Sequence, residues 1–211
     1  MIDAWQRALV LAPHTDDGEF GCGGTMARLV EAGCDVHYVA FSIATRSLPE
    51  GFAPDTLAQE VREATAELGI PEERLTVHDF DVRTFPERRQ DILELLVGLW
   101  EELAPDVVFQ PSLHDVHQDH QTIAQEGLRA FKRTTIFGYE IPWNNFDFSY
   151  GASVGLEERH VERKVAAVQR YASQQHRRYA NAEYIWNLAR VHGTNVNRDF
   201  AEVFQVYRIV G

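Results

Sequence analysis

The stretch that decides the fold is LVLAPHTDDGEFGCGG, residues 9–24. It opens as an apolar run typical of a buried strand, and the run stops at Pro13. One imidazole and three carboxylates follow within six residues of that proline, and the glycines that come next let the backbone turn sharply. A strand that ends in this way predicts a polar site at the edge of a sheet.

The polar residues of this stretch have the spacing of a metal site. His14 and Asp17 are three positions apart, so a tight turn at a strand end can point both side chains at one place. Converging nitrogen and oxygen ligands suit Zn²⁺, with other borderline divalent ions left open. Asp16 lies between them and would sit beside the metal without binding it, where a general base for metal-activated water belongs.

Length and composition restrict the kind of protein that carries this site. The chain has 211 residues, of which 45% are hydrophobic, and this predicts a single domain over residues 1–211. Twenty basic residues against 32 acidic ones give a net charge of −12, which repels nucleic acid and anionic membrane surfaces. Only Cys22 and Cys34 are present, too few for a disulfide scaffold, and no signal peptide or long apolar span is recognisable. We therefore expect a cytoplasmic protein without nucleic-acid or membrane partners, either a monomer or a homo-oligomer.

Apolar runs alternate with helical periodicity along the chain. We expect strands at residues 8–12, 36–42, 75–80, 106–110, 135–140 and 201–210. We expect helices at residues 25–32, 56–68 and 86–104, one ending near 131, and two more at 156–171 and 178–191. This order predicts an α/β fold, a Rossmann-like three-layer sandwich with a mostly parallel sheet.

A second polar cluster follows the strand expected at residues 106–110 and consists of His114, His117, Asp119 and His120. Open parallel sheets bind ligands beyond the carboxyl ends of their strands, so the two clusters can lie side by side. If His120 joins His14 and Asp17, the set has two imidazoles, one carboxylate and a position for water. That is the pattern of a catalytic zinc site.

The two motifs resemble those of a known family. PHTDDGEFGCGG resembles the first motif of the PIG-L/LmbE-like N-deacetylases, and HQDH resembles their second motif, H-x-D-H. Segments EVREATAELGI, Ser173-Gln174 and FAEVF also have counterparts in that family. The resemblance implies zinc-dependent hydrolysis of the N-acetyl amide of an amino sugar or its glycoside. It implies zinc ligands at His14, Asp17 and His120, a general base at Asp16, and the first histidine of the second motif at His117.

Asp119 lies just before an expected helix and between the two histidines of HQDH. Its carboxylate is expected to orient His117 or another histidine through the second ring nitrogen. If the imidazole is His117, it would be held charged and would stabilise the oxyanion of the reaction.

The chain also departs from the family pattern. Gly18 stands where the family commonly has Glu, which leaves the role of Glu19 open. A substrate-contacting Arg of the family falls on Leu57, so neither the substrate-binding residues nor a phosphate on the substrate can be assigned; Arg46 and Arg62 are only guesses. Two alternatives remain besides the enzyme: a non-catalytic metal- or sugar-binding domain, and a nucleotide-binding Rossmann protein. Met26 opposes the latter, because a dinucleotide motif needs glycine there.

Several aromatic, cysteine and histidine residues lie outside the ligand set expected from these two motifs. Trp143, Phe146, Phe148 and Tyr150 fall in a Pro- and Asn-containing loop. They are expected to form either core or a wall for a sugar ring. Cys22 is expected to pack in the core, and His114 and His192 are expected to be structural or loop residues.

Overall fold

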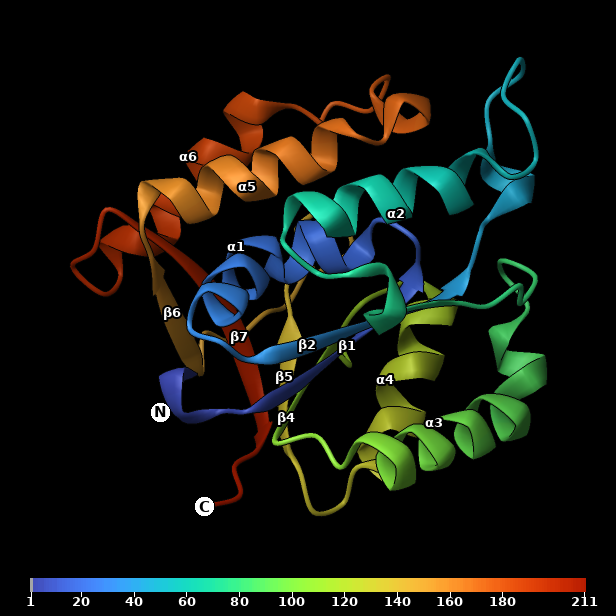
Figure 1. Cartoon of the computed structure of the whole chain (residues 1–211), viewed down its shortest axis with the longest axis horizontal. Coiled ribbons are helices and arrows are strands. Elements are labelled where there is room, and N and C mark those ends of the chain that lie inside the picture. The colour runs from blue at the N-terminus through green and yellow to red at the C-terminus, as the bar shows by residue number, and fades with distance from the viewer. Residues whose placement is uncertain (1) are drawn as a thin grey trace.

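A seven-stranded sheet in the order β3-β2-β1-β4-β5-β7-β6 runs through the molecule, as described for residues 2–211 by a computed structural model (Figure 1). The strands are β1 (Arg7–His14), β2 (Asp35–Ser42), β3 (Leu75–Val77), β4 (Val107–Pro111), β5 (Thr135–Tyr139), β6 (Ala152–Leu156) and β7 (Phe200–Arg208). Strands β1 to β5 pair in parallel, whereas β7 is antiparallel to β5 and to β6. The expected mostly parallel α/β sheet is confirmed.

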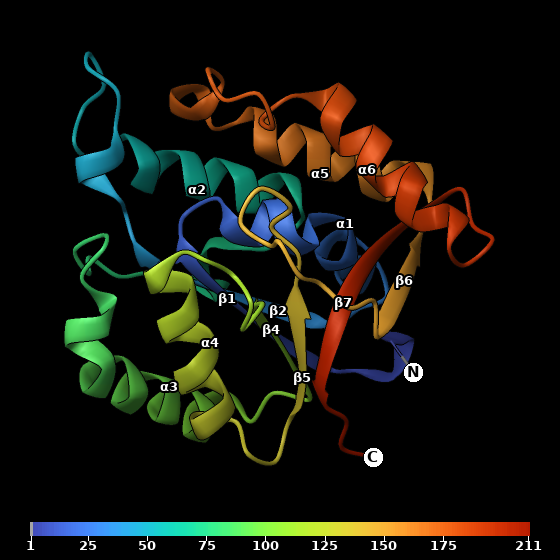
Figure 2. The same cartoon turned by 180° about the vertical axis from the view of Figure 1, so that it is seen from behind.

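Helices cover both faces of the sheet. They are α1 (Asp17–Glu31), α2 (Thr56–Glu67), α3 (Arg89–Leu103), α4 (Gln118–Ala130), α5 (Glu158–Gln169) and α6 (Ala182–Thr194). Helices α1, α2, α5 and α6 lie on one face, and α3 and α4 lie on the other (Figures 1 and 2). Among residues 2–211, no helix has both the length and the apolar character needed to cross a membrane.

Strand β1 contributes to the cores on both faces. Its successive side chains alternate, so Ala8 and Val10 join the core under α1, whereas Leu9 and Leu11 join the core under α3 and α4. A strand buried on both faces needs apolar residues at every position. This explains why the first strand reads so clearly in the sequence.

Helix α1 begins at Asp17, so the expected start at residue 25 is wrong. The helix is kinked at Cys22, whose φ of −147° and ψ of 27° are not helical. The N–H groups of Gly24 and Thr25 donate to the Glu202 carboxylate at 3.0 and 2.7 Å. A carboxylate from β7 thus satisfies the backbone donors near the kink, which lets this glycine-rich segment stay helical.

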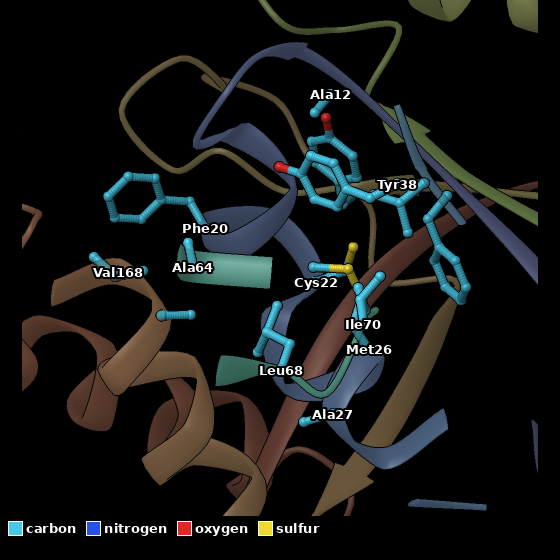
Figure 3. Packing of buried hydrophobic residues seen from close by; sticks show 14 of the residues in the cluster. Ala12, Phe20, Cys22, Met26, Ala27, Tyr38, Ala64, Leu68, Ile70 and Val168 are labelled. Carbon is cyan, nitrogen blue, oxygen red and sulfur yellow. The ribbon is translucent and has the colours of Figure 1, made fainter. Parts of the chain in front are cut away.

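The larger core lies beneath this helix. Cys22 and Met26 of α1 belong to the same buried cluster as Leu68, which follows α2, and Val168 of α5 (Figure 3). Cys22 is fully buried, and burial raises the pKa of its thiol well above the usual range. It packs in the core, as expected.

Strand β6 was not predicted from the sequence, in which the next expected element was a helix from residue 156. This strand lies at the edge of the sheet, pairs only with β7 and is mostly half-buried, so it lacks the apolar signal of an inner strand. Helix α6 begins at Ala182 and not at residue 178, because the Asn181 side chain caps it by accepting the Tyr184 N–H at 2.9 Å.

The topology places the two polar clusters together. The chain order of the strands reverses between β1 and β4, and such a switch point leaves a crevice at the carboxyl ends of the two strands. His14 is the last residue of β1, and the loop after β4 leads into α4. The site is therefore built at the edge where the sequence predicted it.

Candidate active site

Three side chains converge at this edge of the sheet. Nδ1 of His14 lies 3.1 Å from Oδ2 of Asp17 and 3.3 Å from Nε2 of His120. The same oxygen of Asp17 lies 3.2 Å from Nε2 of His120. Tetrahedral zinc with bonds of about 2.0–2.2 Å separates its ligand atoms by roughly 3.3 Å. The spacing and the chemistry of this ligand triangle, His14, Asp17 and His120, therefore fit a zinc ion.

Two buried carboxylates hold the imidazoles of the ligand triangle from behind. Nε2 of His14 donates to Asp119 at 3.1 Å, and Nδ1 of His120 donates to Asp115 at 2.8 Å. Both carboxylates are fully buried. Such partners fix the tautomer and orientation of a metal-ligating histidine and raise its basicity.

The histidine that Asp119 orients is thus His14. Asp115 is not among the site residues predicted from the sequence, so its contact with His120 was missed. Its place five residues before His120, in a loop that follows a strand, gave no periodic signal.

His117 differs from its expected state. Its Nδ1 accepts the Asp119 N–H at 3.2 Å as the N-cap of α4, and the Asp119 carboxylate lies 4.0 Å away. Burial and the positive charges of His120 and His14 lower the pKa of His117 to about 4. The expectation of a charged His117 held by Asp119 is wrong, because the helix N-terminus already occupies that nitrogen. A neutral ring in this arrangement carries its proton on Nε2.

The three imidazoles remain close neighbours. One nitrogen from each of His14, His117 and His120 lies within 4.8 Å of the others. His117 is therefore close enough to the ligand triangle for the three histidines to form a group that could hold a metal ion.

Asp16 lies beside the ligand triangle without belonging to it. It precedes α1, yet its side chain makes no capping hydrogen bond. Burial and the neighbouring charge of Asp17 raise its pKa to about 6. A carboxylate with a pKa near neutrality can both accept and return a proton.

The three members of the ligand triangle shift one another's pKa values. Burial disfavours charge on all three groups, but Asp17 raises the pKa of His14, and Asp17 and Asp115 raise that of His120 to about 10. The two imidazoles in turn hold the pKa of Asp17 far below its usual range, against its burial. In the metal-free protein, the raised pKa values favour protons on the imidazoles of His14 and His120, and a metal ion would have to displace those that face Asp17.

A cavity of about 340 Å³ opens in front of the ligand triangle and Asp16, within the size range of small-molecule sites. Trp143 is stacked on Tyr179 along this cavity, with ring centroids 3.6 Å apart and planes at 8°. Phe20 meets Trp143 edge-on at 5.2 Å. Of the aromatic loop, Trp143 forms part of this wall, whereas Phe146 is 87% exposed.

Glu19 belongs to the support of the turn that carries the ligands. Its buried carboxyl group contacts the hydroxyls of Tyr38 and Tyr171, and burial raises its pKa to about 8. The same hydroxyls lie 2.8 and 2.7 Å from the Thr15 carbonyl oxygen. These contacts hold the backbone between His14 and Asp16 in place.

The remaining candidate residues lie outside this arrangement. His114 is exposed and faces Asp147 at 3.5 Å. His192 lies in α6 and not in a loop as expected; it faces Glu140 at 3.1 Å and packs its ring edge-on against Tyr150.

Comparison with known proteins agrees with this geometry. The family model described as PIG-L, GlcNAc-PI de-N-acetylase, matches residues 9–131, more than half of the 211-residue chain. The chain belongs to the PIG-L family. The matched segment runs from β1 through α4 and contains every member of the ligand triangle.

Curated relatives of this PIG-L chain are deacetylases by name. The uncharacterized deacetylase YaiS of Escherichia coli is 26% identical over 172 residues, which cover 78% of this chain and 90% of the relative. Diacetylchitobiose deacetylase of Thermococcus kodakarensis is 27% identical over 134 residues, 59% of this chain. The match spans 49% of that relative, about half of its length.

Solved structures share the fold over nearly the whole chain. The conserved protein TT1542 from Thermus thermophilus has a TM-score of 0.80 and 27% identity, covering 97% of this chain and 96% of that one. GalB, the 4-carboxy-2-hydroxymuconate hydratase from Pseudomonas putida, has a TM-score of 0.76 and 22% identity, covering 98% of each chain. Because a hydratase shares this fold, the reaction has to be argued from the site.

Proposed function

We propose that this chain is a zinc-dependent hydrolase that cleaves the N-acetyl amide of an amino sugar or its glycoside into acetate and free amine. The observation that carries the proposal is the ligand triangle of His14, Asp17 and His120 beside Asp16, a carboxylate that makes no capping hydrogen bond to the helix it precedes. Membership of a family described as a GlcNAc-PI de-N-acetylase supports it. A relative named as a diacetylchitobiose deacetylase supports the sugar substrate.

The chain's own residues account for the proton transfers. His14, Asp17 and His120 would hold the zinc ion, and the chemistry it would supply there is that of a Lewis acid for the acetamide carbonyl and for water. Asp16 accepts a proton as water attacks the carbonyl carbon, and it gives that proton to the leaving nitrogen as the C–N bond breaks. Nε2–H of His117 donates to the oxyanion that forms in between. Amide and water are thus converted into acetate and amine without any other reactant.

The cavity provides the binding surface. The Trp143–Tyr179 stack and Phe20 offer an apolar wall for one face of a sugar ring. The free cysteines Cys22 and Cys34 support a reducing, cytoplasmic location. The net charge of −12 supports a small-molecule substrate over nucleic acid or a membrane surface.

The decisive test combines metal analysis with a product assay. Dialysed protein is expected to retain one zinc ion per chain, and acetate release is measured on N-acetylglucosamine, its glycosides and sugar nucleotides. His14→Ala and His120→Ala should each lose both metal and activity. Metal content that survives both substitutions would contradict the site. Sugar binding without acetate release would favour the non-catalytic sugar-binding alternative. The presence of Asp16 beside the ligand triangle, with no capping hydrogen bond, opposes that alternative.

A further inference from the structure

Two arginines, Arg83 and Arg177, line the same cavity as Asp16. Among residues 2–211, no carboxylate forms a salt bridge with either guanidinium, although the chain has 32 acidic residues. The sequence-based guesses behave otherwise: Arg46 pairs with Asp81 at 3.5 Å and Arg62 with Glu72 at 3.4 Å. Neither guanidinium is thus paired directly with a carboxylate, although the charge of Arg177 acts on Asp16 across the cavity and lowers the pKa of that carboxyl.

Arg177 is fixed in position before any ligand binds. Its Nε donates to Oε1 of Gln174 at 2.7 Å, and its Nη1 donates to the Tyr179 hydroxyl at 2.8 Å. Tyr179 is itself stacked on Trp143. A guanidinium has five N–H donors in a planar fork, so three are left for a ligand. Because the side chain is already ordered, binding costs little further conformational entropy.

Arg83 is tied to the reacting centre through its backbone. Its φ of 71° is left-handed, and its N–H donates to the Asp119 carboxylate at 2.6 Å. Asp119 is the group that also holds His14. The loop after β3 therefore places the exposed Arg83 side chain at the rim of the cavity.

The position where the family resemblance places a substrate-contacting arginine is apolar in this chain. Leu57 lines the same cavity and is only 3% exposed. Any cation that contacts the substrate must come from another element. The loop between α5 and α6 supplies Arg177, and the loop between β3 and α3 supplies Arg83.

Building on the proposed function, we propose that Arg177, with Arg83 at the rim, binds an anionic group of the substrate, a carboxylate or a phosphate. This group would lie on the part of the sugar conjugate remote from the acetamide, because Asp16 and Asp17 repel anions near the reacting amide. A planar fork with free N–H donors matches the oxygens of either anion. The two arginines would thus determine specificity, and the preferred substrate is an anionic N-acetyl sugar conjugate.

The proposal is tested with substrates that carry small groups of different charge at the anomeric position. The neutral methyl glycoside of N-acetylglucosamine is compared with its carboxymethyl glycoside, its 1-phosphate and its cationic 2-aminoethyl glycoside. Wild-type protein should favour an anionic substrate in kcat/KM by roughly 10- to 100-fold, the scale of charge-assisted hydrogen bonds. The carboxymethyl and phosphate arms show which anion is bound.

Variants assign this preference to residues. Arg177→Gln should raise KM for the anionic substrate by most of that factor and leave the neutral glycoside nearly unchanged, whereas Arg83→Gln should have a smaller effect in the same direction. Arg178→Gln is the matched control, because its exposed neighbouring side chain does not line the cavity. Equal wild-type rates on neutral and anionic substrates would overturn the proposal. So would an Arg177→Gln variant that slows the neutral glycoside as much as the anionic one, since the arginine would then act on Asp16.

A binding measurement separates this proposal from the proposed function. In calorimetric titrations of the Asp16→Asn variant, the carboxymethyl glycoside should bind at least about tenfold more tightly than the methyl glycoside. Adding Arg177→Gln should abolish that difference. Charge-selective binding without acetate release by wild-type protein would contradict the proposed deacetylase function and support the proposed anion site. Acetate release without charge-selective binding would do the reverse.

Discussion

Asp16 and Asp17 are adjacent in the sequence, yet their surroundings give them opposite properties. The imidazoles of His14 and His120 hold the pKa of Asp17 far below its usual range despite burial. For Asp16, burial and the charge of Asp17 outweigh the opposing charges of His14 and Arg177, so its pKa is raised to about 6. A low-pKa carboxylate suits a metal ligand, and a raised one suits a general base.

The first prediction separates these two roles. Asp16→Asn should retain metal and lose activity by about 10² to 10⁴, the usual loss for a general base. Asp17→Asn should instead weaken metal binding. In the wild type, kcat should fall as pH drops through the pKa of Asp16, at or somewhat below the metal-free value of about 6, because a nearby zinc ion favours the carboxylate. Swapped metal contents of the two variants would mean that the roles are reversed.

The second prediction concerns the carboxylates behind the ligand triangle. Asp119→Asn replaces the carboxylate that accepts from His14 by a neutral amide, and Asp115→Asn does the same to the carboxylate that accepts from His120. Each should weaken zinc affinity about 10- to 100-fold, measured by competition with a chelator. His117→Ala is the control: it should bind zinc normally and lower kcat by roughly 10² to 10³, because it loses an oxyanion donor. Unchanged zinc affinity in both aspartate variants would make these contacts incidental.

At the scale of elements, the parts that could be predicted are those whose signal is local. Strands β1 and β4 are buried on both faces, and their apolar runs marked the edge where the two metal motifs meet. The start of α1 could not be predicted, because its glycine-rich first half depends on Glu202, far along the chain. Edge strand β6 carries little apolar pattern.

The same reasoning applies to the site. The convergence of His14, Asp17 and His120 could be predicted from motif spacing, because these residues follow two adjacent strands. Arg83 and Arg177 could not, because they reach the cavity from loops whose course follows from tertiary packing. Asp115 was missed for the same reason.

The third prediction tests the close approach of α1 to the sheet. A Cβ at Gly21 would lie 2.3 Å from the Tyr139 ring, so Gly21→Ala must displace α1, the helix that begins with Asp17. We expect a loss of about 1–3 kcal/mol in unfolding free energy and weaker zinc binding. Gly98→Ala in α3 is the matched control, since nothing lies within 4 Å of an added Cβ there. It should gain roughly 0.5–1 kcal/mol. Equal urea midpoints for the two variants would contradict the packing argument.

At the scale of the whole molecule, metal binding, protonation and stability are linked. The raised pKa values of His14 and His120 mean that their interactions stabilise the metal-free fold fully below about pH 6.5. For His120 that contribution is lost as the pH rises towards about 10. The depressed pKa of Asp17 means that its interactions stabilise the fold fully above the usual pKa of an aspartate, about 4, and that this contribution is lost as the pH falls further. The proposed zinc ion would require the deprotonated imidazoles, so its binding would release protons and strengthen with pH.

The fourth prediction follows from this linkage. Zinc at roughly 100 times its Kd stabilises the native state by about 2.7 kcal/mol, which raises Tm by about 5–10 °C for a chain of this size. At fixed total zinc, the Tm increase should be large near pH 8 and small near pH 5.5, because protons on His14 and His120 then compete with the metal. His14→Ala should abolish the increase at both pH values, whereas Arg178→Gln should leave it unchanged. A zinc-induced increase of the same size at both pH values would show that the metal binds away from these imidazoles.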